Sequence, residues 1–165
     1  MARIPKHGPM NMSTRYELLI DNNSISIAPI DAGKAHGVNL QVGWSNVAKI
    51  FAKNLPSPLE IERAIDLIEE EISRTKAALE PGAQVHAKQA SIRQIAATAG
   101  LDVPHQTQLS ANAVENLFTR MTMAAYGNSA PEDADHSSEF FAALIILREL
   151  MHHLEIDPAV IDLQE

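Results

Sequence analysis

The sequence contains no cysteine, which excludes disulfide bonds, thiolate metal ligands and cysteine nucleophiles. A cytoplasmic location is the simplest interpretation, because disulfides belong to oxidising compartments. Aromatic residues are also scarce, at 4% of the chain, so the core must consist mainly of aliphatic side chains. The longest strongly apolar run, 140–147, is far shorter than the roughly 20 residues that cross a bilayer. We therefore expect no membrane-spanning segment.

The remaining composition is that of a folded protein. Hydrophobic residues make up 45% and charged residues 21% of 165 residues, which fits one globular domain. We expect a flexible segment over 1–13 and a single domain over 14–165. The net charge is −8, and residues 127–165 hold nine acidic residues against one arginine. This acidity disfavours nucleic acid as a partner.

The segment that follows the flexible start is expected to be extended. Ile25 and Ile27 alternate with serines, as in a strand with one buried face. The pattern predicts two strands, 15–20 and 24–28, joined as a hairpin by the polar turn 21–23. Residues 38–42 also alternate and are a candidate third strand.

Helical periodicity dominates the rest of the chain. The clearest signal is the segment Ser57-Pro-Leu-Glu60, a capping box that predicts a helix from Pro58 to Leu79. Further helices are expected over 45–55, 89–99 and 110–126, and from Ser137 or Ser138 onward. The predicted fold is α+β and mostly helical, with about five helices packed with a small N-terminal antiparallel hairpin or three-stranded sheet. Because 140–147 is apolar on every side, we expect it in the core or at an interface.

One segment resembles part of a DNA-binding motif. The stretch from Ile92 to Leu101 is similar to the first helix and turn of a helix-turn-helix, in which small residues let two helices meet and a glycine forms the turn. The following residues, 103–108, contain no lysine or arginine to contact DNA. Packing therefore explains 92–126 better than DNA binding, which stays an alternative.

Two groups of residues are candidates for metal binding. Glu149 and His152 are three residues apart on a predicted helix, as in the Glu-x-x-His motif of di-iron helical bundles, and His153 follows. A second such motif is missing, so a polar helix end is the simpler interpretation. Carboxylates of the acidic run 69–71 are also suited to a divalent cation, although most such runs are solvated helix faces.

A glycine-flanked loop is the best single candidate for ligand binding. Residues 33–37 supply the amine of Lys34 and the imidazole of His36, and Trp44 follows as a possible contact surface. The glycine order differs from that of a phosphate-binding loop, and no serine-nucleophile motif is found. We therefore assign no catalytic residue and no cofactor.

Because no catalytic pattern is complete, the main functional hypothesis is a non-catalytic interaction or assembly module, acting as a homo-oligomer or as a subunit of a larger complex. Its interface residues would be Phe140, Phe141, Leu144 and Ile145, from the over-apolar segment. The alternatives are a small-molecule or metal-dependent enzyme with a His/Glu site, and a helix-turn-helix DNA-binding protein.

Overall fold

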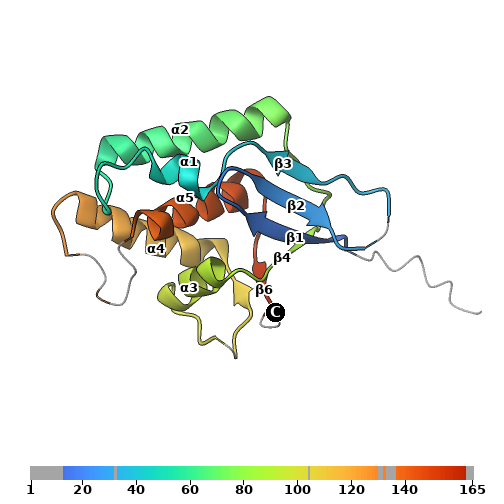
Figure 1. Cartoon of the computed structure of the whole chain (residues 1–165). Helices are drawn as coiled ribbons and strands as arrows, with labels where there is room; N and C mark the ends of the chain where they lie inside the picture. Colours follow the sequence, from blue (N-terminus) through green and yellow to red (C-terminus); the bar gives the residue numbers. More distant parts are fainter. Residues whose placement is uncertain (1–12, 32, 104, 130–131, 133–136, 163–165) are drawn as a thin grey trace, which may run out of the picture.

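The computed structural model describes residues 13–31, 33–103, 105–129, 132 and 137–162. Of the expected flexible segment 1–13, all but Ser13 lie outside these residues. The described chain contains a six-stranded mixed sheet and five helices (Figure 1). The sheet order is β3-β2-β1-β4-β6-β5. The strands are β1 Arg15–Ile20, β2 Ile25–Pro29, β3 Val38–Leu40, β4 Gln84–Ala87, β5 Gln108–Leu109 and β6 Ala159–Ile161.

The first three strands form an antiparallel meander. Leu18 pairs with Ile27, and Ile27 pairs with Val38. Every second side chain of β1 is buried, and Ile25 and Ile27 of β2 are buried as their alternation with serines predicted. The expected hairpin and third strand are therefore confirmed.

The predicted fold class is wrong, because three further strands enlarge the meander into an α/β sheet. β4 and β6 run parallel to β1, and β5 is antiparallel to β6. Helices make the crossover connections between the parallel strands. The added strands have only two to four residues, too few to display an alternating pattern. Their pairing depends on partners far away in the sequence, such as β1 for β4.

A helix forms in each of the five predicted segments, but the first, expected over 45–55, ends at Ala48. Beyond it the amides of Ile50 and Phe51 donate to carbonyls three residues back rather than four, so the α-helix stops. The helices are α1 Trp44–Ala48, α2 Pro58–Thr75, α3 Ala90–Thr98, α4 Ala111–Ala125 and α5 Ser138–His153. The capping box of α2 forms as expected: the Glu60 amide donates to the Ser57 hydroxyl, and the Ser57 amide donates to the Glu60 carboxylate. α2 ends at Thr75 rather than Leu79, because Lys76 adopts a left-handed backbone with φ 52°.

α5 is the central helix of the fold. It packs against α1, α2, α3 and α4, and Figure 1 shows it between α2 and α4. Every side chain of 140–147 is buried within the chain. The interpretation of this segment as an interface is therefore corrected. The four proposed interface residues are at most 4% exposed and belong to the hydrophobic core: Phe140, Phe141, Leu144 and Ile145.

Two other sequence-based interpretations are decided by the fold. Residues 99–110, which include β5, separate α3 from α4. A helix-turn-helix joins its helices by about three or four residues, so 92–126 is not such a motif. No helix in the described part of the chain combines the length and apolarity needed to cross a membrane.

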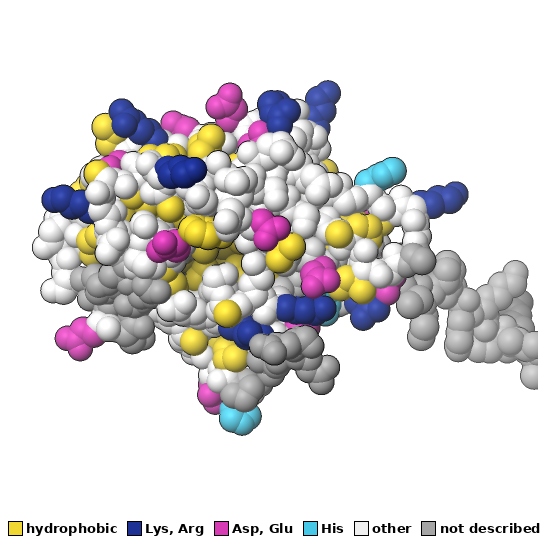
Figure 2. Space-filling view, in the orientation of Figure 1, with side chains coloured by type: hydrophobic (Ala, Val, Ile, Leu, Met, Phe, Trp, Pro, Cys, Tyr) yellow, Lys and Arg dark blue, Asp and Glu magenta, His cyan; other side chains and the backbone are white. Residues whose placement is uncertain are grey.

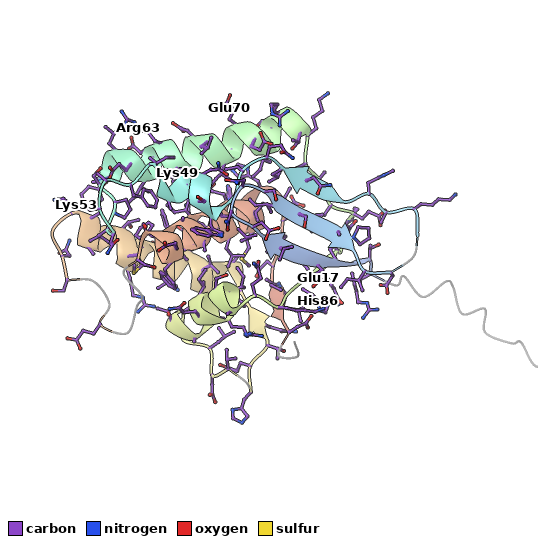
Figure 3. All side chains as sticks on the ribbon, in the orientation of Figure 1. Glu17, Lys49, Lys53, Arg63, Glu70 and His86 are labelled. Carbon is purple, nitrogen blue, oxygen red and sulfur yellow. The ribbon has the colours of Figure 1, made fainter. Side chains whose placement is uncertain are left out.

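Several acidic residues of α2 are exposed to solvent, among them Glu62, Asp66 and Glu70. Arg63 and Glu70 point outward from α2, and Lys49 lies nearby after α1 (Figure 3). Figure 2 shows basic and acidic side chains interspersed over this upper part of the molecule. Glu71 is bound by Arg74 at 2.7 Å. Most of the acidic run is therefore a solvated, partly neutralised helix face.

Candidate functional site

The C-terminal ends of the parallel strands β1 and β4 lie at the same edge of the sheet, here called the carboxyl edge. At this edge the β1–β2 turn is held on the start of α1. The Trp44 amide donates to Asp21 O at 3.1 Å, and the Ser45 amide donates to Asn22 O at 3.0 Å. Gly43 allows this approach, since a Cβ there would lie 2.1 Å from Asp21 O. The turn is therefore fixed at the carboxyl edge.

Gln89 links the end of β1 to the start of α3. Its amide nitrogen donates to Ile20 O at 2.9 Å, and its amide oxygen accepts from Ile20 N at 2.7 Å. These two bonds continue the β1–β4 pairing beyond the last paired residues. Because the Gln89 side chain is used in this way, α3 begins without a side-chain cap.

A hollow of about 170 Å³ lies at the carboxyl edge, here called the edge hollow. The first turns of α3 and α5 line it, together with Trp44 at the start of α1. Helix N-termini carry partial positive charge and favour anions. Glu139 adds a carboxylate on the α5 side. The lining residues are Ile20, Trp44, Gln89, Ser91, Gln94, Ser137, Glu139, Phe140 and Ala143.

The three predicted ligand-binding residues do not form one site. Trp44 lines the edge hollow, whereas Lys34 lines a wider depression of about 520 Å³ at the opposite edge of the sheet, beside the start of β1. His36 is exposed on the link between β2 and β3. In the depression around Lys34, Arg15 binds Asp31 through two hydrogen bonds of 2.6 and 3.0 Å, which hold the pKa of that carboxyl below its ordinary value.

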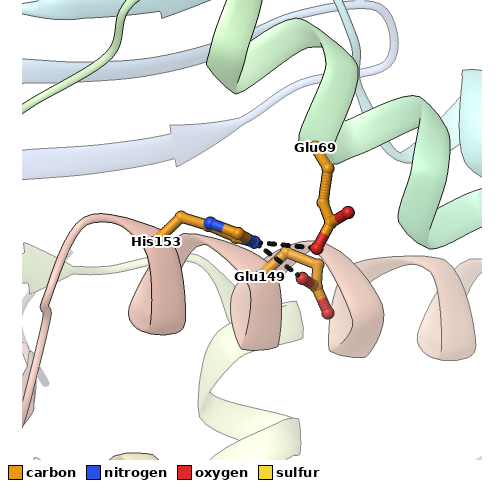
Figure 4. Close-up of side chains that lie close together, drawn as sticks. All are labelled: Glu69, Glu149 and His153. Atoms are coloured by element: carbon orange, nitrogen blue, oxygen red, sulfur yellow. Dashed lines mark hydrogen bonds and ion pairs between the residues drawn. The ribbon is translucent and has the colours of Figure 1, made fainter.

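A second polar cluster joins α2 to α5. His153 Nε2 lies 3.0 Å from Glu69 Oε1 and 3.4 Å from Glu149 Oε2 (Figure 4). The Glu149 side chain is only 2% exposed. Its other oxygen accepts a hydrogen bond from Arg148, which also binds Glu115 at 2.6 Å. Burial lowers the pKa of Arg148, but these two carboxylates together raise it above its ordinary value.

The structure thus unites two of the three predicted metal ligands. Glu149 and His153 meet, while His152 is exposed and lines a hollow beside Glu115 on α4. Glu69 completes the cluster, and sequence reasoning missed this role. The acidic run 69–71 was a signal for a carboxylate site, but only the packing of α2 on α5 selects the residue.

Sequence reasoning also missed most of the edge hollow. Gln89 and Ser91 follow β4 and open α3, and residues that follow a parallel strand and open a helix are common ligand contacts in α/β proteins. This signal was not usable, because β4 was not recognised and the sheet was taken as purely antiparallel. Glu139 opens α5 after α4 and carried no such signal.

No protein-family model matches the sequence, and the curated proteins contain no match. Solved structures do resemble the fold. An Aquifex aeolicus PPX-GPPA enzyme is 15% identical, with a TM-score of 0.67 over 91% of this chain and 53% of its own. An exopolyphosphatase from Cytophaga hutchinsonii is 11% identical, with a TM-score of 0.60 over 93% of this chain and 54% of its own. An exopolyphosphatase-like protein gives a TM-score of 0.66 at 11% identity, over 96% of this chain and 59% of its own.

These comparisons establish the fold and correct the main functional hypothesis. The chain spans about half the length of the solved structures that it matches. Those proteins are described as enzymes, and the apolar segment 140–147 that suggested an interface is internal. The hypothesis of a non-catalytic interaction module is therefore wrong, and the enzyme alternative fits these findings better. Formation of a homo-oligomer, association with a protein partner and exclusion of nucleic acid stay predictions.

Proposed function

We propose that this chain hydrolyses a phosphate ester or phosphoanhydride, and that the edge hollow holds a phosphate group of the substrate. The observation that carries the proposal is the convergence of the first turns of α3 and α5 on this hollow. Two helix N-termini that line one small space favour a compact anion. Solved structures of the same fold are described as phosphatases and exopolyphosphatases, which supports phosphate as the ligand class.

The lining residues suggest how the reaction is divided. The helix N-termini and the Ser91 hydroxyl hold the phosphoryl oxygens and stabilise the negative charge that develops on them. Glu139 acts as the general base: it takes a proton from a water molecule, whose oxygen forms the new bond to phosphorus. The bond from phosphorus to the leaving oxygen then breaks, and that oxygen keeps the electron pair.

Phosphate binding is tested with a matched pair of charge changes. Gln94 lines the edge hollow, and Gln84 lies at the opposite edge of the same sheet. Q94E should weaken the binding of inorganic phosphate or short polyphosphate at least about fivefold, because a like charge in the hollow repels the ligand. Q84E should bind as the wild type does. Calorimetric titration measures both, and equal affinities of the two variants would refute the placement of the ligand.

Hydrolysis is tested by the release of phosphate from inorganic polyphosphate. E139Q should lower kcat about a hundredfold or more, since positioned proton transfer contributes roughly that much. Its affinity for phosphate should stay equal or improve, because a negative charge is removed. Unchanged turnover in E139Q would remove the assigned base. A wild-type chain that neither binds nor hydrolyses polyphosphate would refute the proposed function.

A further inference from the structure

We propose that Glu69, Glu149 and His153 bind one divalent transition-metal cation that joins α2 to α5, with Zn²⁺ as the ion that fits best. Their three donor atoms all lie within 4.8 Å of one another. The imidazole nitrogen is 3.0 and 3.4 Å from the two carboxylate oxygens. Neighbouring donors around a tetrahedral Zn²⁺ with bonds of 2.0–2.2 Å are about 3.3–3.5 Å apart. Both separations are therefore near those of a formed site.

The buried carboxylate gives a second, independent reason to expect a ligand here. The Glu149 side chain is 2% exposed, and its Oε2 points at the cluster (Figure 4). Among the described residues this oxygen pairs with His153 Nε2 at 3.4 Å, and that nitrogen lies closer to Glu69, at 3.0 Å. A buried carboxylate is costly unless it is closely paired, and a cation between the three donors would pair it more strongly.

The local charges also attract a cation. The guanidinium of Arg148 lies next to the cluster and forms ion pairs with both Glu115 and Glu149. With Glu69 included, three carboxylates face one positive charge when the imidazole is neutral. The difference is two negative charges, which a divalent cation balances.

The donor types point to the class of metal. One imidazole nitrogen with two carboxylate oxygens suits Zn²⁺, whereas Mg²⁺ prefers oxygen ligands and retains several waters. Three protein ligands leave a fourth position for water. Glu69 and His153 have side chains that are 44% and 32% exposed, so the ion reaches the cluster from solvent.

The experiment uses the full chain, freed of metal with a chelator and titrated with Zn²⁺ in a calorimeter. The wild type should bind one equivalent, and E69Q and H153N should each lose at least about tenfold in affinity. The neighbours Glu70 and His152 supply matched controls, because Glu70 points outward from α2 and His152 lies beside α4. E70Q and H152N should bind as the wild type does.

Thermal unfolding separates binding from folding. Without metal, circular dichroism should show that both E69Q and H153N are folded. Zn²⁺ should raise the melting temperature of the wild type and H152N more than that of H153N, because the ion connects two helices only when both are folded. No saturable binding by the wild type, unchanged affinity in H153N, or equal loss in H152N would overturn the site. Phosphate release plays no part in these measurements, so they are independent of the proposed hydrolase.

Discussion

The substitution G43A tests how the carboxyl edge is assembled. Gly43 has φ −136° and ψ −177°, an extended conformation that alanine adopts without strain. The obstacle is space, because the new Cβ would lie 2.1 Å from Asp21 O and 2.5 Å from the carbonyl carbon of Asn22. Real Cβ atoms do not approach so closely. The β1–β2 turn must therefore move away from α1.

The expected cost of G43A follows from two contributions. Overpacking of a tight contact costs about 1–3 kcal/mol. The two hydrogen bonds from the Trp44 and Ser45 amides lengthen or break, and each is worth about 0.5–1.5 kcal/mol. We expect the free energy of unfolding to fall by about 2–6 kcal/mol, and the melting temperature by about 5–20 °C.

Urea unfolding measures the G43A effect, with G33A as the matched control. A Cβ at Gly33 meets nothing within 4 Å, so G33A should change the stability by less than about 0.5 kcal/mol. The slope of the unfolding transition should stay the same in both variants, because the exposed surface is unchanged. A G43A variant as stable as G33A would show that the turn does not depend on its contact with α1.

Three further changes probe charge and packing. Arg74 holds the pKa of Glu71 below its ordinary 4.5, so this ion pair stabilises the fold above that pH, and its contribution is lost as the pH falls through the lowered pKa. In E71Q the free energy of unfolding should therefore fall less steeply on acidification, and an unchanged dependence on pH would contradict this. R148M leaves buried Glu149 without its cation and should cost about 2–4 kcal/mol in urea unfolding, partly recovered by adding E149Q; a neutral R148M would refute the pairing. L144A, fully buried at the centre of α5, should cost about 2–5 kcal/mol, whereas a loss below 1 kcal/mol would argue against its central place.

The sequence predicts α2 to α5 and the first two strands well, because each is long enough to show its own period. The expected helix 45–55 is reduced to the five residues of α1. α2 carries an isoleucine stripe and a capping box, and α5 is apolar on all sides. β4 and β6 have four and three residues. Their status as strands comes from partners on β1 and on each other, not from a local pattern. The fold class therefore could not be predicted from local sequence patterns, because it depends on strand pairing between distant segments.

The sites were partly predictable for the same reason. Glu149 and His153 are four residues apart on one helix, so their proximity follows from helical geometry. Glu69 is 84 residues away from His153 and joins them only through the packing of α2 on α5. The edge hollow draws on α1, α3 and α5 at once, so no single segment of sequence could reveal it.

The position of β6 in the sheet has a consequence for synthesis of the chain. β6 is the last strand along the described sequence, yet it lies between β4 and β5 rather than at an edge. Until residues 159–161 leave the ribosome, β4 has one unpaired side and β5 has no partner in the sheet. A nascent chain in this state exposes a strand edge that is able to pair with another copy. The sheet is therefore complete only after β6 has been synthesised, and slow or interrupted translation just before β6 should favour aggregation.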